Sequence, residues 1–333
     1  MTNTAAVALV GSESLLGREV RDLAANQSAF TLRLLAADSG QAGAITRVGD
    51  EPAIVEELRA GSFDGARVVV LAGSAESGRH ALELAEPAGL AVVDLTGVAE
   101  ELPDARLRAP LVEEEEPEAG GGVQVIAHPA AIALALFLRR LHSHEPVARA
   151  VAQIFAPASE HGRQGVEELQ QQTIHLLSFK PLPQKIFDAQ TAFSLLARYG
   201  ADAPRPLEKA ELRIERHLAT LLALPGDGEG VPPPSLRLIQ APVFHGYSMS
   251  LWVEFESSPE VETLESALSS PSIDVRGADF EPPTNVGQAG QSGISVGAIA
   301  PDRNSAEACW FWLVADNLRL TAENGVAVVR QLV

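Results

Sequence analysis

The chain has 333 residues, of which 46% are hydrophobic and 21% are charged, and 44 acidic against 25 basic residues give a net charge of -19. With a mean hydropathy of +0.07, this composition excludes wholesale disorder and predicts a soluble globular protein of two domains. The acidic balance, without a cluster of Lys or Arg, excludes nucleic acid and membrane surfaces as partners. The single Cys309 excludes a disulfide framework, and residues 1–10 lack a signal peptide, so we expect a cytoplasmic protein.

The first half of the sequence alternates short apolar runs with helical patterns. The runs with little polar alternation, which are predicted as strands buried on both faces, are 5–10, 32–37, 67–72, 90–95 and 123–127. Helical spacing lies between them at 17–26, 54–59 and 78–88. This alternation predicts an α/β fold class, with a Rossmann-like parallel sheet domain over residues 1–128.

The pattern changes after a charged, glycine-ended segment at 113–122, which we expect to be a solvated loop. A buried helix over 130–141 and an amphipathic helix over 164–177 are predicted next. The predicted strands of this half are 147–156, 236–243, 248–255, 294–299 and 308–315. Together they predict an α+β domain with a mixed sheet over residues 129–315.

The first predicted strand runs directly into Gly11-Ser-Glu-Ser-Leu-Leu-Gly17 and then into a helix. Glycines permit the tight turn of a dinucleotide-binding loop, and the helix N-terminus attracts a pyrophosphate. Here Ser14 replaces the middle glycine, and Glu13 adds a carboxylate that would repel a bound pyrophosphate. Two interpretations stay open, a turn kept for packing alone and a weak cofactor site formed by Gly11, Ser12, Ser14, Leu15 and Gly17.

Five segments, in the same order along most of the chain, resemble the aspartate-semialdehyde dehydrogenase family. Segment 11–17 resembles its Gly-Ala-Thr-Gly-x-x-Gly loop, 126–131 its Ala-Asn-Pro-Asn-Cys segment, 160–169 its Ser-Gly-Ala-Gly to Glu-Leu stretch, 240–248 its Arg-Val-Pro-Val to Gly-His-Ser segment, and 314–318 its Asp-Asn-Leu. The catalytically degenerate Usg-type branch is the most similar. The resemblance implies a dimerisation role for the second domain and a helix over 316–333 that completes the first.

The resemblance also places four catalytic positions, and all four are changed in this chain. The family's nucleophilic cysteine matches Ala131, its base matches Tyr247, its substrate-binding arginine matches Gln240, and its orienting glutamine matches Ala156. A methyl group cannot form a thioester, a phenol is a poor proton acceptor at neutral pH, and an amide lacks the charged fork that binds a carboxylate. We therefore expect no catalytic residues and a pseudoenzyme with a regulatory or partner role.

An alternative function is an NAD(P)-dependent oxidoreductase that acts on an aldehyde or a related small metabolite without a cysteine thioester. Such an enzyme needs only a proton donor such as Tyr247. Asp38 and Ser39 stand where the family carries an Arg-Ser pair that holds the 2′-phosphate of NADP. Because a carboxylate repels phosphate but accepts hydrogen bonds from ribose hydroxyls, we expect weak or absent binding, with NAD favoured over NADP.

The remaining polar residues give weaker signals. His161 and His245 lie near the catalytic segments, with Ser159 and Glu160 beside the former, so a rebuilt Ser-His-acid arrangement is one interpretation. Adjacent residues on an extended segment point to opposite sides, which favours satisfied or exposed histidines instead. No histidine spacing indicates a metal site, and Cys309 in a core strand is expected to be inert.

The second domain is expected to form a homodimer. The predicted strand 308–315 is apolar on both faces, with Trp310 and Trp312 on one of them, and the strand 248–255 carries Trp252 on its outer face. Soluble monomers rarely expose such a surface, so a partner sheet would bury it. The alternative is that a helix over 208–222 covers this face from within the chain.

Overall fold

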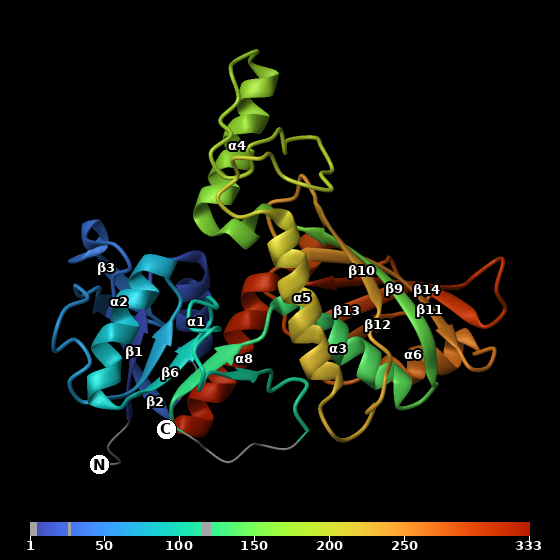
Figure 1. Cartoon of the computed structure of the whole chain (residues 1–333), viewed down its shortest axis with the longest axis horizontal. Helices are drawn as coiled ribbons and strands as arrows, with labels where there is room; N and C mark the ends of the chain where they lie inside the picture. Colours follow the sequence, from blue (N-terminus) through green and yellow to red (C-terminus); the bar gives the residue numbers. More distant parts are fainter. Residues whose placement is uncertain (1–4, 26–27, 115–120) are drawn as a thin grey trace. The chain divides into compact units, whose positions relative to one another are not determined.

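The computed structural model describes residues 5–25, 28–114 and 121–333, and the chain divides into two compact units (Figure 1). Unit 1 consists of Met1–Ala127 with Thr321–Val333, and unit 2 of His128–Leu320. One unit contains a parallel sheet and the other a mixed sheet. The predicted fold class is confirmed.

Unit 1 is built on a six-stranded sheet in the order β2-β1-β5-β6-β8-β7, in which every pair of neighbours is parallel. Its strands are β1 (Ala5–Val10), β2 (Phe30–Leu35), β5 (Ala66–Leu71), β6 (Ala91–Asp94), β7 (Arg106–Arg108) and β8 (Val123–Ile126). Its helical segments are α1 (Leu15–Ala24), η1 (Ser39–Gln41), α2 (Ala75–Ala85) and η2 (Glu86–Ala88). The residues Val7–Val10 and Val68–Leu71 are at most 1% exposed, as expected for central strands covered on both faces.

The C-terminal helix α8 (Asn317–Leu332) begins in unit 2, and its later turns belong to unit 1. Asn324 Oδ1 accepts a hydrogen bond from the Leu111 backbone N–H at 3.1 Å, and Gln331 Oε1 accepts one from Arg108 at 2.7 Å. Gly325 approaches Leu95 so closely that a Cβ at this position would lie 2.4 Å from a leucine methyl. These contacts attach the end of the chain to the first sheet.

The helix expected at 54–59 is wrong. Residues 51–54 form β4 (Glu51–Ile54), which pairs with β3 (Ile45–Val48) in an antiparallel hairpin, and an irregular segment follows. The backbone N–H of Glu56 donates to Leu34 at the edge of β2, so it is not available for a helix. A six-residue segment is also too short to form a helix without strong tertiary support.

Other boundaries shift by a few residues. Helix α1 begins at Leu15, ahead of the expected start, and residue 26 of the expected helix 17–26 lies outside the described ranges. Residues 115–120 of the expected loop 113–122 lie outside them as well.

Unit 2 contains a six-stranded sheet in the order β10-β9-β11-β14-β13-β12. Its strands are β9 (Val147–Ala156), β10 (Ser235–Gln240), β11 (Tyr247–Phe255), β12 (Ile273–Arg276), β13 (Ile294–Pro301) and β14 (Ala308–Ala315). The central pairs are antiparallel, whereas β10 pairs with β9 and β12 with β13 in parallel. The sheet is therefore mixed.

The helical segments of unit 2 are α3 (Pro129–His142), η3 (Ala158–His161), α4 (Gly162–Leu177), α5 (Leu207–Leu222), α6 (Val261–Leu268) and α7 (Asn285–Gln288). Helices α3, α5 and α6 pack together on one face of the sheet. Phe137 of α3 contacts Phe311 of β14 edge to face, with ring centroids 5.1 Å apart, and α5 packs against α3. Figure 1 shows α4 standing away from the sheet. Within the described ranges, no helix combines the length and apolar character needed to cross a bilayer.

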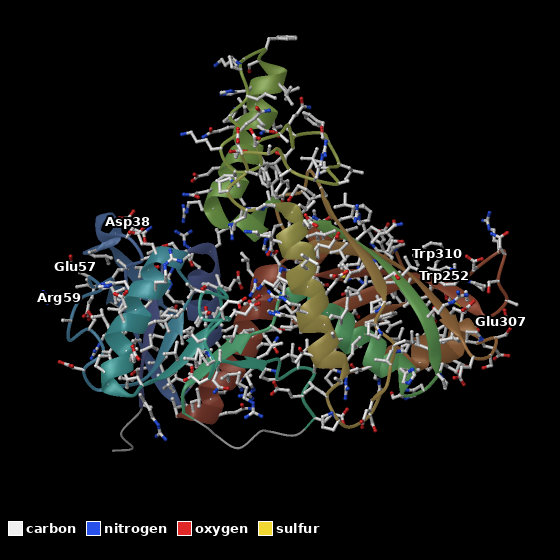
Figure 2. All side chains as sticks on the ribbon, in the orientation of Figure 1. Asp38, Glu57, Arg59, Trp252, Glu307 and Trp310 are labelled. Atoms are coloured by element: carbon white, nitrogen blue, oxygen red, sulfur yellow. The ribbon has the colours of Figure 1, made fainter. Side chains whose placement is uncertain are left out.

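The opposite face of the sheet is open in the single chain. Trp310 is 41% exposed, and Asp302 Oδ2 accepts hydrogen bonds from Trp310 Nε1 at 2.7 Å and Trp252 Nε1 at 3.2 Å (Figure 2). Trp312 Nε1 donates to the Pro283 carbonyl at 3.0 Å. Because α5 packs against α3 on the other side, it does not cover these tryptophans. We call this surface, formed by Trp252, Trp310 and Trp312, the tryptophan face.

Candidate functional site

Three of the four residues that the resemblance places at catalytic positions lie at one end of the unit 2 sheet. Gln240 ends β10 and pairs in register with Ala156, which ends β9, while Tyr247 begins the neighbouring strand β11. Ala131 lies in the first turn of α3, three residues after His128, whose ring centroid is 6.1 Å from that of Tyr247. The fold therefore brings segments that are far apart in sequence to one place, and Ala131, Ala156, Gln240 and Tyr247 are all at most 1% exposed.

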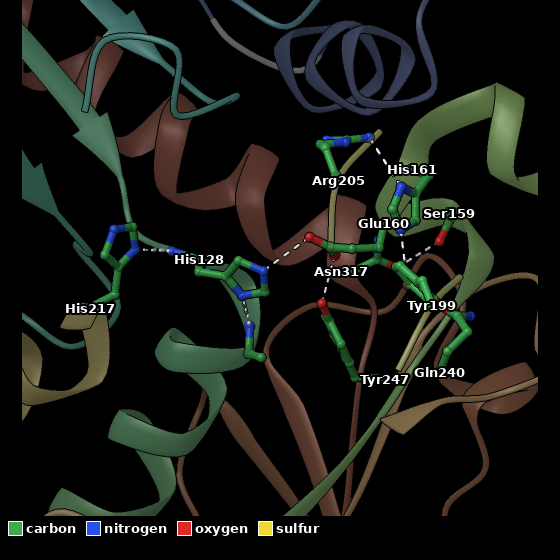
Figure 3. A network of polar contacts seen from close by, with 11 residues as sticks. His128, Ser159, Glu160, His161, Tyr199, Arg205, His217, Gln240, Tyr247 and Asn317 are labelled. Atoms are coloured by element: carbon green, nitrogen blue, oxygen red, sulfur yellow. Dashed lines mark hydrogen bonds and ion pairs between the residues drawn. The ribbon is translucent and has the colours of Figure 1, made fainter. Parts of the chain in front are cut away.

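The carboxylate of Glu160 is the centre of this site (Figure 3). Its Oε1 accepts a hydrogen bond from His128 Nε2 at 3.0 Å, and its Oε2 accepts one from the Tyr247 hydroxyl at 2.6 Å. Two further hydrogen bonds hold His128 in place. Its ring Nδ1 accepts from the Ala130 backbone N–H at 3.2 Å, and its backbone N–H donates to His217 Nδ1 at 2.9 Å. With Nδ1 accepting, the proton of a neutral ring is on Nε2 and points at Glu160.

These contacts determine the protonation of the site. Burial acts to raise the pKa of Glu160, but the attraction of His128 and the hydrogen bonds from His128 and Tyr247 outweigh it and hold the pKa well below the ordinary value. Burial, and then the charge and hydrogen bond of Glu160, raise the pKa of Tyr247 well above its ordinary value. At neutral pH the carboxylate is ionised and the phenol keeps its proton, which it donates to Glu160.

A second chain of hydrogen bonds starts at the exposed Arg205 and ends at Gln240. Arg205 donates to His161 Nδ1 at 3.3 Å, so His161 Nε2 donates to the Tyr199 hydroxyl at 3.0 Å, which donates to Gln240 Oε1 at 2.6 Å. The amide group of Gln240 donates to the carbonyls of Ala156 and Ala241. Each donor is thereby matched to one acceptor.

His161 is neutral in this chain. Burial, followed by repulsion from Arg205, lowers its pKa to about 4, although Glu160 acts in the opposite direction. Its ring also contacts Phe187 edge to face, with centroids 5.0 Å apart. The histidine therefore acts as a hydrogen-bonding link and not as a cation.

The glycine loop of unit 1 is explained by close packing. Gly11 has a φ of +83°, and a Cβ there would lie 2.3 Å from the Gly73 Cα, while a Cβ on Gly17 would lie 2.2 Å from the Gly11 carbonyl oxygen. Ser14 caps α1, since its Oγ accepts from the Gly17 N–H at 2.8 Å and donates to the Ala72 carbonyl at 2.6 Å. Leu15 is the first residue of the helix.

Two polar residues of the same loop bear on anion binding. The fully buried Ser12 hydroxyl has no hydrogen-bond partner among the described residues. The Glu13 carboxylate lies 3.3 Å from Arg21 and 3.7 Å from Arg18, so it neutralises the cations nearest to the start of α1. The loop combines a donor suited to an anion with a carboxylate that opposes one.

A cavity of about 200 Å³ lies beyond the carboxyl end of β2 in unit 1. It is lined by Ala36, Ala37, Glu57, Leu58, Glu76, Ser77 and His80. These lining residues include two carboxylates and no lysine or arginine. The exposed Asp38, three residues after the end of β2, accepts a hydrogen bond from the Gly40 backbone N–H at 3.0 Å (Figure 2). The side chain of Ser39 lies outside the described part of the structure.

Cys309 and metal-ligating groups add no reactive centre among the described residues. Cys309 is buried in β14, and burial, together with the charge of Asp302, raises the pKa of its thiol. Among the described residues, no three His, Cys, Asp or Glu side chains are grouped so that they could hold a metal ion.

Sequence reasoning did not identify Glu160, His128 and Tyr199 as partners in a site. The available signal was that Glu160 and His128 both fall inside segments that resemble the family's catalytic segments but differ from them. Their pairing depends on η3, which turns Glu160 toward the end of β11 and the start of α3. Glu160 is about 30 residues from His128 and about 90 residues from Tyr247 in the sequence, and contacts at such separations leave no local sequence pattern.

Comparison with known proteins identifies the family and the fold. Residues 138–320 match the family described as "Semialdehyde dehydrogenase, dimerisation domain". The structure of a probable aspartate-semialdehyde dehydrogenase from Pseudomonas aeruginosa is similar with a TM-score of 0.84 and 28% identity, covering 99% of this chain and 98% of that one. Aspartate-semialdehyde dehydrogenase II from Vibrio cholerae has the same fold, with a TM-score of 0.84 and 22% identity over 99% of this chain and 98% of its own.

The chain therefore belongs to the semialdehyde dehydrogenase family. Among its relatives is a USG-1 protein homolog of Pseudomonas aeruginosa, which is 28% identical over 98% of this chain and 96% of its own length. The aspartate-semialdehyde dehydrogenase of Rickettsia bellii is 24% identical over 100% of this chain and 99% of its own. The resemblance to this family and to its USG-1 homologues is confirmed.

The low pKa of His161 predicts an acid-sensitive fold. Since the pKa is lowered to about 4 from the ordinary 6.5, the unfolded chain binds this proton more readily. The contribution of His161 to stability is full above about pH 6.5 and is lost as the pH falls toward 4. Between pH 6.5 and pH 4 the parent protein should therefore lose more unfolding free energy than the His161→Gln variant. We expect this difference to be on the order of 2 kcal/mol, measured by urea denaturation at several pH values.

The control is His80→Gln, because the His80 side chain is 51% exposed. This variant should follow the pH dependence of the parent protein. Equal pH dependence in the parent protein and His161→Gln would show that the histidine is not held neutral by the fold.

Proposed function

We propose that this chain is non-catalytic as a dehydrogenase: it has lost the aspartate-semialdehyde dehydrogenase reaction of its family and serves a regulatory or partner role. The observation that carries the proposal is the network centred on Glu160. His128, Glu160 and Tyr247 bind one another at the place where the family resemblance puts the nucleophile and the base. Tyr247 stands at the family's base position, and because its phenol keeps its proton and donates it to Glu160, it cannot accept a proton from a substrate at neutral pH.

No thiol takes the place of the family's nucleophilic cysteine near this network. Ala131 offers a methyl group, and acyl transfer through a thioester needs a thiolate. The single cysteine, Cys309, lies opposite Val253 in the interior of the sheet, where its thiol stays protonated. Gln240 stands in place of an arginine, and its amide is fully engaged. Its Nε2 donates to two backbone carbonyls, and its Oε1 accepts a hydrogen bond from the Tyr199 hydroxyl.

The same contacts weigh against an oxidoreductase that uses Tyr247 as a proton donor. The side chain is fully buried, its proton is donated to Glu160 at 2.6 Å, and its pKa is raised by burial and by that carboxylate. A general acid works best with a pKa near the operating pH, and this phenol is far from it. The alternative of an NAD(P)-dependent enzyme without a thioester is therefore the weaker candidate.

The first test is the dehydrogenase assay itself. We expect phosphate-dependent oxidation of aspartate semialdehyde, with NADP or NAD, to stay at the buffer rate, because residues that act as one catalytic unit fail together. Aspartate-semialdehyde dehydrogenase II of Vibrio cholerae serves as the positive control. Turnover above the buffer rate that disappears in Glu160→Gln would contradict the proposal, since contaminating activity would not respond to this substitution.

Cofactor binding is proposed to be weak or absent, with NAD favoured over NADP. Glu57 and Glu76 line the unit 1 cavity and Asp38 is exposed after β2, so carboxylates dominate the region after the strand that the family uses for the 2′-phosphate. Carboxylates repel that phosphate but accept hydrogen bonds from ribose hydroxyls. The buried Ser12 hydroxyl and the start of α1 support residual binding of a pyrophosphate.

Titration calorimetry tests this preference. We expect no micromolar binding of NADP, and any detectable binding should favour NAD. Asp38→Arg should shift the preference toward NADP by about tenfold, because it converts a repulsive charge into an attractive one. Asp22→Arg, which makes the same charge change elsewhere on unit 1, is the matched control. Micromolar NADP affinity in the parent protein would refute the proposal.

We also propose that the chain forms a cytoplasmic homodimer through unit 2. The match to a dimerisation domain supports this, as does the tryptophan face, where Trp310 is 41% exposed. Val151, which pairs with Trp252 in the sheet, is also 41% exposed. The tryptophan face lies on the side of the sheet that α3 and α5 do not cover. Burying such a surface against a second copy removes apolar area from water.

Sedimentation equilibrium measures the assembly directly. We expect a single species of twice the 35.1 kDa chain mass at micromolar concentration. Trp310→Glu should weaken the dimer by at least about tenfold, because it places a charge in the centre of the interface. Leu212→Glu, on the exposed side of α5, should not. A 35.1 kDa species at micromolar concentration would rule the dimer out.

A further inference from the structure

A serine, a histidine and an aspartate lie in line beside the Glu160 network, in a group that the proposed function does not use. Ser159 Oγ is 3.1 Å from His245 Nδ1, and His245 Nε2 is 2.9 Å from Asp316 Oδ1. The three residues come from η3, from the segment between β10 and β11, and from the residue that precedes α8. The sequence favoured satisfied or exposed histidines, because adjacent residues on an extended segment point to opposite sides, whereas Ser159, Glu160 and His161 lie in the η3 turn.

The hydrogen bonds around Asp316 assign the protons of this group. Asp316 is 1% exposed and accepts from the backbone N–H groups of Gly290 at 2.7 Å and Leu318 at 3.0 Å. Burial opposes its charge, but His245 and these backbone donors prevail and lower its pKa. The aspartate is therefore ionised and takes the proton of His245 Nε2, which leaves Nδ1 as an acceptor directed at the Ser159 hydroxyl.

The serine hydroxyl has one competing acceptor. Asn317 Oδ1 lies 3.2 Å from Ser159 Oγ and also accepts from the Gly246 N–H at 3.3 Å. The hydroxyl hydrogen can thus turn between the amide and the imidazole. Only the imidazole can accept the proton fully, because an amide oxygen is not a base at neutral pH.

The surroundings limit what can react there. Ser159 is 3% exposed, while the His245 side chain is 29% exposed, so only a compact group can reach the hydroxyl. The long helix α4 begins at Gly162, three residues after the serine, and the positive end of a helix favours negative charge that develops nearby. The neighbouring Glu160 is engaged by His128 and Tyr247 and does not compete for His245.

We propose that Ser159, His245 and Asp316 form a nucleophilic triad that accepts the acyl group of a small carboxylic ester. Ser159 Oγ attacks the carbonyl carbon while its proton passes to His245 Nδ1. The ester C–O bond then breaks, and His245 returns the proton to the leaving alkoxide. Water hydrolyses the acyl-serine by the reverse transfers, so that one ester and one water give one acid and one alcohol. Asp316 orients the imidazole and stabilises its charged form.

The test uses p-nitrophenyl acetate with the full-length protein. We expect a burst of p-nitrophenol and one acetyl group on the protein, which peptide mapping places on Ser159. Ser159→Ala should lower the acylation rate at least about a hundredfold, and His245→Gln should lower it by a similar factor. Ser178→Ala, at an exposed serine of the same unit, should leave the rate unchanged.

Mapping on the parent protein needs no variant, so a folding failure in Ser159→Ala does not prevent a decision. Absence of a burst, or an acetyl group on another residue, would overturn the triad. This test and the dehydrogenase assay can fail independently. The proposed loss of the dehydrogenase reaction rests on Ala131 and Tyr247, whereas the triad rests on Ser159 and His245.

Discussion

A carboxylate largely withdrawn from water must be matched by hydrogen-bond donors, and the Glu160 side chain, which is 20% exposed, meets this requirement with two partners from distant parts of the chain. His128 precedes α3 and Tyr247 begins β11, so the pairing joins the helical layer of unit 2 to the end of its sheet. Removing either donor would leave a charge only partly solvated, at a cost well above that of an ordinary hydrogen bond. The three residues thus depend on one another.

This dependence supports the proposal that a fold shared with dehydrogenases carries a site without dehydrogenase chemistry in this chain. An active site holds its reactive groups in place but leaves them free to bind substrate, which costs stability. Here the Glu160 network and the chain from Arg205 to Gln240 satisfy their own polar groups, so the site stabilises the unit that contains it. Ser159 and His245, at the margin of this site, lie 3.1 Å apart in the arrangement that we propose to be reactive.

The sequence predicted what local patterns encode. The strands 147–156 and 308–315 were located to the residue, because uninterrupted or alternating apolar runs report burial directly. The hairpin of β3 and β4 was missed, because its pairing is short and its exposed residues carry no apolar alternation. The links from Glu160 to His128 and Tyr247 could not be predicted, since they depend on the η3 turn and on contacts between segments far apart in sequence.

The most direct measurement is a double-mutant cycle between Glu160 and Tyr247. The unfolding free energies of Glu160→Gln, Tyr247→Phe and the double variant are compared with that of the parent protein by urea denaturation at pH 7. If the carboxylate and the phenol support each other, the effects of the single substitutions will differ from additivity by about 1 to 3 kcal/mol. Additivity within about 0.5 kcal/mol would contradict the account, because independent residues cannot form the centre of the site.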